Sequence, residues 1–147
     1  MEKLLSVSKL FEQQTLKSSD KVAVECGNET ITYKHLNNAA NKIAGFLKEK
    51  DIEKDDIVAV HMERSIPMVQ SILGIWKRRA AFVLLDPIHS DKRKKEILEI
   101  VNPKHFITLS KHKNGNKLPI SSDNVTVLDE ISPRLNAFSD VNPDTVP

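Results

Sequence analysis

Short apolar runs alternate with amphipathic segments along most of this chain, and this alternation restricts the possible folds more than any other sequence feature. Ile57–Met62, Ala80–Leu85 and His105–Thr108 have the length and the apolar content of buried strands. Segments with apolar residues at helical spacing separate these runs. Strands that alternate with helices favour a parallel sheet joined by right-handed crossovers. The sequence therefore predicts an α/β fold, with a mainly parallel, Rossmann-like sheet flanked by helices.

A β-hairpin is expected before this sheet. Lys21–Cys26 alternates like a strand, and Glu29–Thr32 has the composition of its partner. Gly27 and Asn28 lie between the two runs, and both residues tolerate the positive φ of a two-residue hairpin turn. Ahead of the hairpin, apolar residues at helical spacing, with polar residues between them, predict a further helix: Leu4, Leu5, Val7, Leu10 and Phe11.

Three later helices have recognisable starts. Thr32 can cap a helix over about residues 33–50, because its hydroxyl can accept a free N–H of the first turn. Ser65 is the candidate cap of the next helix, and Ser90 or Asp91 that of the helix that runs to residue 101. Three apolar residues of this last helix are expected to face inward: Ile97, Leu98 and Ile100.

The chain becomes polar after the last of the long apolar runs. Residues 111–117 have the composition of an exposed loop, and Val125–Leu128 is expected to form one more short strand. After Ile131 no periodic signal remains. We therefore expect a folded unit over residues 1–135, followed by an extended, linker-like tail over residues 136–147.

Length, charge and cysteine content narrow the class of protein further. The chain has 147 residues and a net charge of +2, which fits one compact domain without the strong basic field typical of nucleic-acid binding. Cys26 is the only cysteine, so no disulfide framework and no cysteine cluster for a metal is expected. No apolar stretch is long enough to span a bilayer, and residues 1–5 do not resemble a signal peptide. These features predict a cytoplasmic protein.

The residues that could carry chemistry have ordinary structural interpretations. Asp86, before Pro87 at a strand end, favours a turn. Glu63 and Arg64 are expected to pair with each other or with a neighbouring element, and Lys92–Lys95 to form a solvated helix face. The histidines are scattered without metal-ligand spacing, so no metal site is expected from them: His35, His61, His89, His105 and His112.

Four segments resemble motifs of one family, in the family's order and spacing. Residues 31–36 (ITYKHL), with the helix that follows, resemble the first core motif of amino-acid adenylation domains, and residues 71–87 (SILGIWKRRAAFVLLDP) resemble the second. Residues 58–65 (VAVHMERS) are similar to the family's VAIxxERS segment, and residues 93–100 lie where the family has an RxxxIL helix. The chain thus resembles the N-terminal portion of a nonribosomal peptide synthetase adenylation domain, in the AMP-forming, acyl-adenylate-forming superfamily.

The resemblance implies the chemistry of the complete domain. Such domains bind ATP, Mg²⁺ and an amino acid, form an aminoacyl-adenylate with release of pyrophosphate, and load the acyl group onto a carrier-protein thiol. In the family, the groups that this chemistry needs come after the position that matches Pro147. The four glycines of this chain are far apart, so they cannot form a loop around phosphates. We therefore expect no catalytic, cofactor-binding or metal-binding residue here, and ATP and Mg²⁺ only in the complete parent domain.

Departures from the second core motif bear on whether the domain is active. Arg78 and Arg79 stand where the family has Ala-Gly, and Leu84 stands where it has proline. Glycine suits the left-handed position after a helix end, and arginine does not adopt it readily. These departures favour a non-catalytic, truncated domain that acts as a structural or docking module in peptide natural-product biosynthesis. The alternative is an excised or split fragment of an active adenylating domain. An unrelated nucleotide-binding α/β domain is disfavoured by the absent glycine-rich loop.

An incomplete lobe would also need a partner. Its sheet would leave an edge or a face with exposed apolar surface and unpaired backbone groups. We expect this surface to bind other peptide synthetase domains, such as a neighbouring condensation domain or the missing adenylation region, or to form a homodimer. Neither nucleic acid nor a membrane is expected as a partner.

Overall fold

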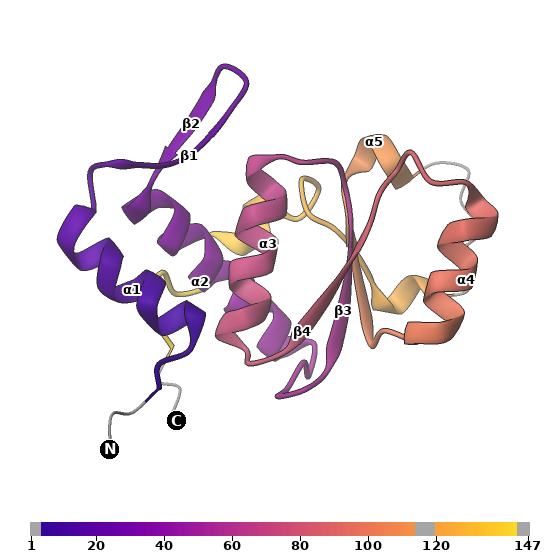
Figure 1. Ribbon diagram of the computed structural model, residues 1–147. Helices are drawn as coiled ribbons and strands as arrows, with labels where there is room; N and C mark the ends of the chain where they lie inside the picture. The colour runs from indigo at the N-terminus through magenta and orange to yellow at the C-terminus, as the bar shows by residue number, and fades with distance from the viewer. Residues whose placement is uncertain (1–3, 114–119, 144–147) are drawn as a thin grey trace.

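The computed structural model in Figure 1 describes residues 4–113 and 120–143. The first elements are α1 (Val7–Ser18), β1 (Val22–Cys26) and β2 (Glu29–Thr32). Helices and strands then alternate in the order α2 (Tyr33–Glu49), β3 (Ile57–His61), α3 (Ile66–Lys77), β4 (Ala81–Leu85), α4 (Asp91–Val101) and β5 (His105–Thr108). Four short elements follow: α5 (Ser110–Lys113), the 3-10 helix η1 (Ser122–Asn124), β6 (Val125–Val127) and α6 (Ser132–Leu135). This order confirms the predicted α/β fold.

The later strands form one parallel sheet in the order β4-β3-β5-β6. The last residue of β3, His61, lies opposite Leu85 of β4 and opposite Thr108 of β5, so three strands end at the same level. β1 and β2 form a separate antiparallel hairpin, and Gly27 in its turn has a φ of +60°. Both the hairpin and the parallel sheet are therefore as the sequence predicts.

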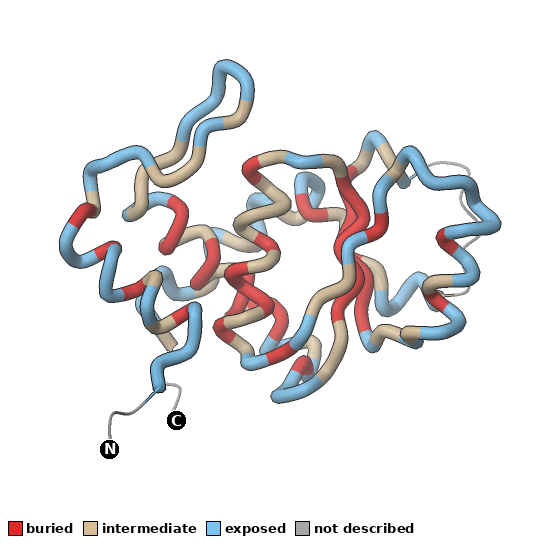
Figure 2. The backbone as a smooth tube through the Cα atoms, in the orientation of Figure 1, coloured by how far each residue is buried: buried red, intermediate tan, exposed pale blue. Residues whose placement is uncertain are grey.

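Helices cover both faces of the sheet (Figure 1): α2 and α3 lie on one side, and α4 lies on the other. Successive strand residues point to opposite faces. Val58 and Val60 of β3 accordingly join a cluster with α2 and α3, whereas Ala59 packs with Leu98 of α4. Figure 2 shows the buried segments concentrated in the central strands and in the helices that pack on them.

A glycine sets the distance between α2 and α3. A Cβ atom at Gly74 would lie 2.6 Å from Cγ2 of Ile43 and 3.2 Å from the carbonyl oxygen of Ala40. A methyl group at this position would therefore overlap with α2. Gly74 serves close helix packing here rather than an unusual backbone conformation.

Side-chain caps confirm the predicted helix starts. Thr32 Oγ1 accepts a hydrogen bond from the backbone N–H of His35 at 3.2 Å. At the start of α3, Ser65 Oγ accepts a hydrogen bond from the backbone N–H of Met68 at 3.3 Å. At α4 the cap is Ser90, whose Oγ accepts from the backbone N–H of Arg93 at 3.1 Å. Each cap satisfies one of the free N–H groups of a first helical turn.

The orientation of α1 differs from that of an ordinary amphipathic helix. Val7, Leu10 and Leu16 are 56%, 52% and 84% exposed. The buried residues of this helix are polar: Ser8, Glu12, Thr15 and Ser18. The cause lies on α3, where the buried Lys77 pairs with the carboxylate of Glu12 at 2.6 Å. This ion pair turns the polar side of α1 toward the protein.

Three smaller expectations are wrong. Leu4 and Leu5 precede α1 instead of forming part of it. Ile100 is 83% exposed, so it does not face the sheet with the rest of the apolar residues of α4. Ser110–Lys113 forms the short helix α5, where we expected the start of a loop. The rest of that expected loop, residues 114–117, lies outside the described residues.

The segment after α6 lies against α2. Phe138 packs edge-on against Phe46, with ring centroids 6.0 Å apart. Asn142 accepts a hydrogen bond from the side-chain amide of Asn41 at 3.0 Å. The described part of the expected tail therefore makes contacts with the folded unit, and a domain boundary at residue 135 stays a prediction.

Candidate functional site

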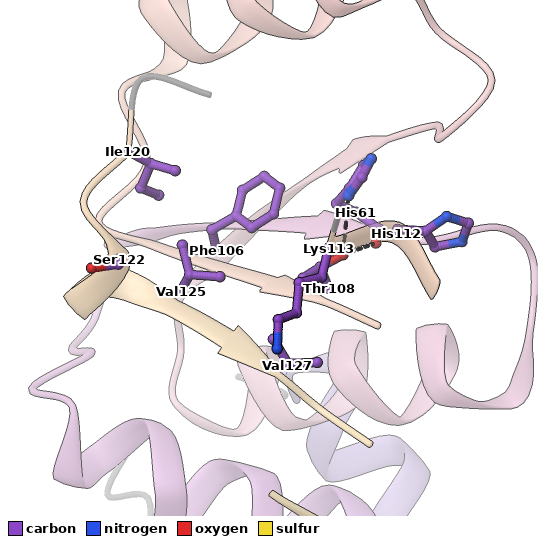
Figure 3. A pocket seen from close by; sticks show the side chains of 9 residues that line it. All are labelled: His61, Phe106, Thr108, His112, Lys113, Ile120, Ser122, Val125 and Val127. Carbon is purple, nitrogen blue, oxygen red and sulfur yellow. Dashed lines mark hydrogen bonds between the residues drawn. The ribbon is translucent and has the colours of Figure 1, made fainter. Parts of the chain in front are cut away.

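The strand order creates a crevice at the carboxyl ends of β3 and β5. The chain passes from β3 to β4 through α3, and then returns past β3 to β5 through α4. The winding direction reverses between β3 and β5, and open α/β sheets bind ligands outside the carboxyl ends of strands at such a point. A cavity of about 340 Å³ lies there (Figure 3), lined by side chains of β3, β5, α5, η1 and β6.

His61 ends β3 beside this cavity and is only 1% exposed. Its Nδ1 lies 3.0 Å from Oγ1 of Thr108, and the Thr108 hydroxyl donates to the carbonyl oxygen of His61 at 3.1 Å. The other ring nitrogen, Nε2, is buried and has no hydrogen-bond partner among the described residues. Burial lowers the pKa of His61 to about 4, and the nearby charges of Lys94 and His112 act in the same direction. The ring is therefore neutral at physiological pH.

Glu63 joins β3 to α5 at the same edge of the sheet. Its carboxylate pairs with Lys111 and with Nε2 of His112. The hydrogen bond from Lys111 and then that from His112 lower the pKa of Glu63 to about 2. The ring centroid of His112 lies 5.6 Å from that of His61. The expectation that Glu63 pairs with a neighbouring element is confirmed, and that element is α5.

A second cavity of about 430 Å³ lies at the start of α4 and shares His61 and His112 with the first. Ser90, Asp91 and Lys94 also line it. Lys94 is only 4% exposed, although the other three residues of the basic run Lys92–Lys95 are exposed. The predicted solvated face therefore holds for three of its four members, and Lys94 instead places a charge beside the buried histidine.

The residues at the ends of α3 and β4 have backbone roles. Asp86 Oδ1 accepts from the backbone N–H of Ile88 at 3.0 Å, which is the turn that the sequence predicts. Arg79 has a φ of +60°, so the left-handed position after α3 exists and is occupied by arginine. Arg78 Nε donates to the carbonyl oxygen of Ile52 at 3.1 Å. Two of the three departures from the second core motif, Arg78 and Arg79, are thus accommodated within the fold.

Several exposed apolar side chains follow one another in the sequence at the beginning of α1. Leu4 and Leu5 precede the helix and are 97% and 42% exposed. Val7 is exposed next to them and lines a hollow of about 270 Å³ together with Trp76 and Ala80. We call Leu4, Leu5, Val7 and Leu10 the N-terminal apolar surface.

A buried ion pair holds α1 in the orientation that exposes this surface. Lys77 is 1% and Glu12 is 7% exposed, and Glu12 also pairs with Lys9 at 3.1 Å. Burial lowers the pKa of Lys77, and the hydrogen bond with Glu12 opposes that effect. Rotation of α1 would leave the ammonium of Lys77 buried without its partner, so Val7, Leu10 and Leu16 stay exposed, while Phe11 of the same helix packs against the cluster of α2 and α3.

His61 is the site residue that interpretation of the sequence missed. As one of five scattered histidines it fails every spacing rule for a metal ligand. The available signal was its position, because His61 is a polar residue at the end of an apolar strand, and that strand ends at the ligand-binding edge of a parallel sheet. Among the described residues, no three His, Cys, Asp or Glu side chains gather as metal ligands, and no helix has the length and hydrophobicity of a membrane span.

Comparison with known sequences identifies a family. The model of the AMP-binding enzyme family matches residues 11–145. Zwittermicin A synthase ZmaJ of Bacillus cereus is 40% identical over 102 residues, which are 69% of this chain and 19% of that protein. Bacitracin synthase 2 of Bacillus licheniformis is 32% identical over 139 residues, which are 92% of this chain and 5% of that protein. The chain thus spans less than a fifth of the length of these two relatives.

Solved structures of low sequence identity share the fold. The N-terminal subdomain of Klebsiella oxytoca NpsA superposes with a TM-score of 0.79 at 20% identity, over 99% of this chain and 36% of that chain. FmoA3, a nonribosomal peptide synthetase in its α-methyl-L-serine-AMP-bound form, gives a TM-score of 0.85 at 23% identity, over 99% of this chain and 16% of that chain. The chain therefore belongs to the AMP-binding enzyme family, and it corresponds to the N-terminal portion of a nonribosomal peptide synthetase adenylation domain.

Proposed function

We propose that this chain is a non-catalytic structural and docking module of a nonribosomal peptide synthetase in the cytoplasm. It supplies one lobe of the adenylation fold, whereas the groups that react with ATP and the amino acid belong to other polypeptide. The observation that carries this proposal is the N-terminal apolar surface, which is exposed before and at the start of a helix whose buried Glu12 pairs with Lys77.

An apolar surface on a rigid support is suited to a protein contact. Exposed apolar patches mark interaction sites when they gather instead of being scattered. Leu4, Val7 and Leu10 are each more than half exposed, and Val7 lines a hollow together with Trp76. Since α1 cannot rotate without breaking the Glu12–Lys77 pair, this surface stays available for a partner.

The described residues provide no loop for the phosphates of ATP. Gly27 forms the turn of the hairpin, Gly45 lies against Phe138, and Gly74 lies between α2 and α3. None of these three glycines stands at the N-terminus of a helix, where backbone N–H groups can surround a phosphate. The proposal therefore assigns ATP and Mg²⁺ to the complete parent domain, and no cofactor to this chain.

We assign the contact to the polypeptide that follows this region in a complete adenylation domain. The NpsA N-terminal subdomain shares the fold of this chain, yet the chain covers only 36% of it. A subdomain of this kind thus has more polypeptide outside the region described here than inside it. A condensation domain and a second copy of this chain are the competing occupants, and the experiment distinguishes them.

The test uses the part of bacitracin synthase 2 that follows the region matching this chain, with binding measured by titration calorimetry. We expect saturable binding by the unaltered chain. A Leu4→Gln, Leu5→Gln double variant should bind at least tenfold more weakly, because burial of one leucine contributes about 1.5–3 kcal/mol. Both leucines precede α1, so neither replacement changes a residue of the helix itself, and circular dichroism checks that α1 is retained.

Leu16→Gln is the matched control for this experiment. Leu16 is 84% exposed near the other end of α1, so its replacement should leave binding unchanged. Equal binding by the double variant and the unaltered chain would contradict the proposal. Binding to a condensation domain without binding to the bacitracin synthase segment would also contradict the proposal. Formation of a dimer through this surface, measured by sedimentation, would contradict it as well.

Sequence similarity favours a second function, in which this chain is part of a working adenylating domain. Identity to bacitracin synthase 2 extends over 92% of the chain, and the fold accommodates Arg79 in its left-handed position. The chain alone should show no ATP–pyrophosphate exchange under either function. Exchange by the complex with the following segment would favour the working fragment, whereas binding without exchange would favour the docking module.

A further inference from the structure

We propose that residues 139–143 form a strap on α2 that opens and closes without unfolding of the rest of the protein, and that Asn142 is the residue that holds it closed. The strap lies at the end of the described chain, which is yellow in Figure 1. Its holding group is the side-chain oxygen of Asn142, which lies among buried donors of α2 and α3. The inference rests on these hydrogen bonds and not on what binds the N-terminal apolar surface, so it is independent of the docking function.

Two amides of α2 and one ammonium of α3 point to the same oxygen of the strap. Asn142 Oδ1 accepts a hydrogen bond from Nδ2 of Asn37 at 2.8 Å and another from Nδ2 of Asn41 at 3.0 Å. Nζ of Lys77, whose short bond is to Glu12, lies 3.5 Å from the same oxygen. Asn37, Asn41 and Lys77 are 7%, 3% and 1% exposed, whereas Asn142 is an exposed residue. A surface segment thus supplies an acceptor to a cluster of buried donors.

The orientation of these side-chain amides follows from their partners. An ammonium can only donate, so the atom of Asn142 that faces Lys77 is its oxygen. A backbone carbonyl can only accept, so the atom of Asn41 that faces the carbonyl of Asp140 at 2.7 Å is its nitrogen. Asn37 and Asn41 direct these N–H groups at the strap even though their own oxygens have no donor among the described residues. The cluster is therefore arranged to hold acceptors of the strap.

The remainder of the strap is loosely held. Val141 is 71% exposed. A hollow of about 350 Å³ is lined both by residues of the strap and by α2, including Ser139, Val141, Pro143, Gly45 and Lys48. Few apolar contacts therefore oppose opening, and a segment held mainly by a few hydrogen bonds opens at a lower free energy than the core. Water can reach the donors of α2 once the strap is open, so opening does not require global unfolding.

Hydrogen exchange of the Asn41 side chain measures this opening. Its NH₂ group donates one hydrogen bond to the carbonyl of Asp140 and one to Asn142. The proton that faces Asp140 is the reporter, because Asn142 does not accept from it and affects it only through the position of the strap. NMR follows the exchange of this proton in the full chain, and the backbone N–H groups of β3 report global unfolding. We expect the reporter to be at least tenfold less protected than the N–H groups of β3.

Asn142→Ala should accelerate exchange of the reporter roughly tenfold, the factor that loss of one hydrogen bond to a buried donor produces, and should leave the protection of β3 unchanged. Asn142→Asp keeps an acceptor oxygen and should retain the slow exchange. Asn136→Ala is the matched control, because Asn136 is an exposed asparagine whose oxygen accepts from Lys42 at 3.5 Å. It should leave the exchange of the reporter unchanged.

Two results would overturn the inference. Exchange of the reporter at the same rate in Asn142→Ala and in the unaltered protein would show that Asn142 does not hold the strap closed. Equal protection of the reporter and of the N–H groups of β3 in the unaltered protein would show that the strap opens only when the whole protein unfolds.

Discussion

The parallel sheet and α1 both rest on the pair formed by α2 and α3, but they bury opposite kinds of side chains. In the sheet, Val58, Ala59 and Val60 of β3 are all 0% exposed and pack against apolar residues of the flanking helices. In α1, Glu12 is 7% exposed, whereas Leu10 is 52% exposed. Apolar burial therefore holds the sheet in place, whereas α1 is held by a buried ion pair together with Phe11, which packs against the cluster of α2 and α3.

This difference teaches that an amphipathic pattern fixes the orientation of a helix only when no charge competes. Exposure of a leucine forgoes about 1.5–3 kcal/mol of burial. A buried lysine without its partner costs about 3–5 kcal/mol. Because Lys77 lies buried on α3, α1 presents Glu12 to it and leaves Val7, Leu10 and Leu16 exposed, while Phe11 packs against the cluster of α2 and α3.

The same substitution in the two regions should give the largest contrast. Leu47 of α2 packs with Val58 and Val60 of the sheet and is 0% exposed. Leu47→Ala should lower the free energy of unfolding by about 4 kcal/mol, because burial is lost and a cavity is left behind. Leu16 on α1 is 84% exposed, and Leu16→Ala should change the stability by less than about 0.5 kcal/mol. Urea denaturation measures both, and similar losses would remove the distinction between the regions.

The ion pair of α1 should matter more than any leucine of that helix. Glu12→Ala should lower the stability by about 3 kcal/mol, because it leaves the ammonium of Lys77 buried without a partner. The Glu12→Leu, Lys77→Leu double variant should recover most of this loss in urea denaturation. Lys9→Ala removes the outer partner of Glu12 and is the control, with little expected effect. A Glu12→Ala protein of unchanged stability would contradict the role of the pair.

Packing between α2 and α3, which supports both regions, depends on Gly74. Gly74→Ala should lower the stability by about 2 kcal/mol, since the new methyl group would overlap with Ile43. Gly45→Ala is the matched control in a helix, where the added Cβ meets only the side chain of Phe138 at 3.1 Å. It should be neutral or slightly stabilising, because alanine is the better helix former. The melting temperatures of the two variants test this difference, and equal shifts would argue against close packing at Gly74.

The buried histidines of the sheet should make the stability of the protein depend on pH, because they are neutral in the folded state. Burial lowers the pKa of His105 from 6.5 to about 4, and Lys50 adds to the effect. Between these values the unfolded chain binds a proton that the folded chain does not. The stability due to His105 is therefore complete above about pH 6.5 and falls by up to about 1.4 kcal/mol per pH unit as the pH decreases toward 4.

Urea denaturation over this pH range checks the effect. His105→Gln should reduce the pH dependence of stability, and the dependence that remains should include His61, whose pKa is lowered in the same way. His89→Gln, at an exposed position, should leave the dependence unchanged. An unchanged slope in the His105 variant would mean that this histidine does not titrate differently in the two states.

The smallest expected effect lies at the end of α3, between the two regions. Arg79 has a φ of +60°, and Arg79→Gly should raise the stability by about 1 kcal/mol because glycine adopts this conformation without strain. Arg78, with a φ of −88°, is the control, and Arg78→Gly should lower the stability. Loss of stability in Arg79→Gly would show that the arginine side chain contributes more than its backbone conformation costs.

Much of the fold could be predicted from local signals. The caps Thr32, Ser65 and Ser90 stand at the starts of their helices, because a cap depends only on residues a few positions away. The turn at Asp86 and the left-handed position at Arg79 are likewise local. The candidate site could not be predicted in this way, since His61 and Thr108 are 47 positions apart and meet only through strand pairing.

The amino-acid sequence by itself determined the order of helices and strands and the resemblance to adenylation domains, because periodicity, caps and motifs act over short stretches of chain. Only the tertiary structure decided which side of α1 is buried, because that depends on an ion pair between Glu12 and a lysine 65 positions away. It also decided that one of five scattered histidines, His61, is buried beside a cavity with Nδ1 next to Thr108 and with no partner for Nε2 among the described residues. Both outcomes depend on burial and on partners brought from distant elements, and a buried polar group is costly until a partner reaches it.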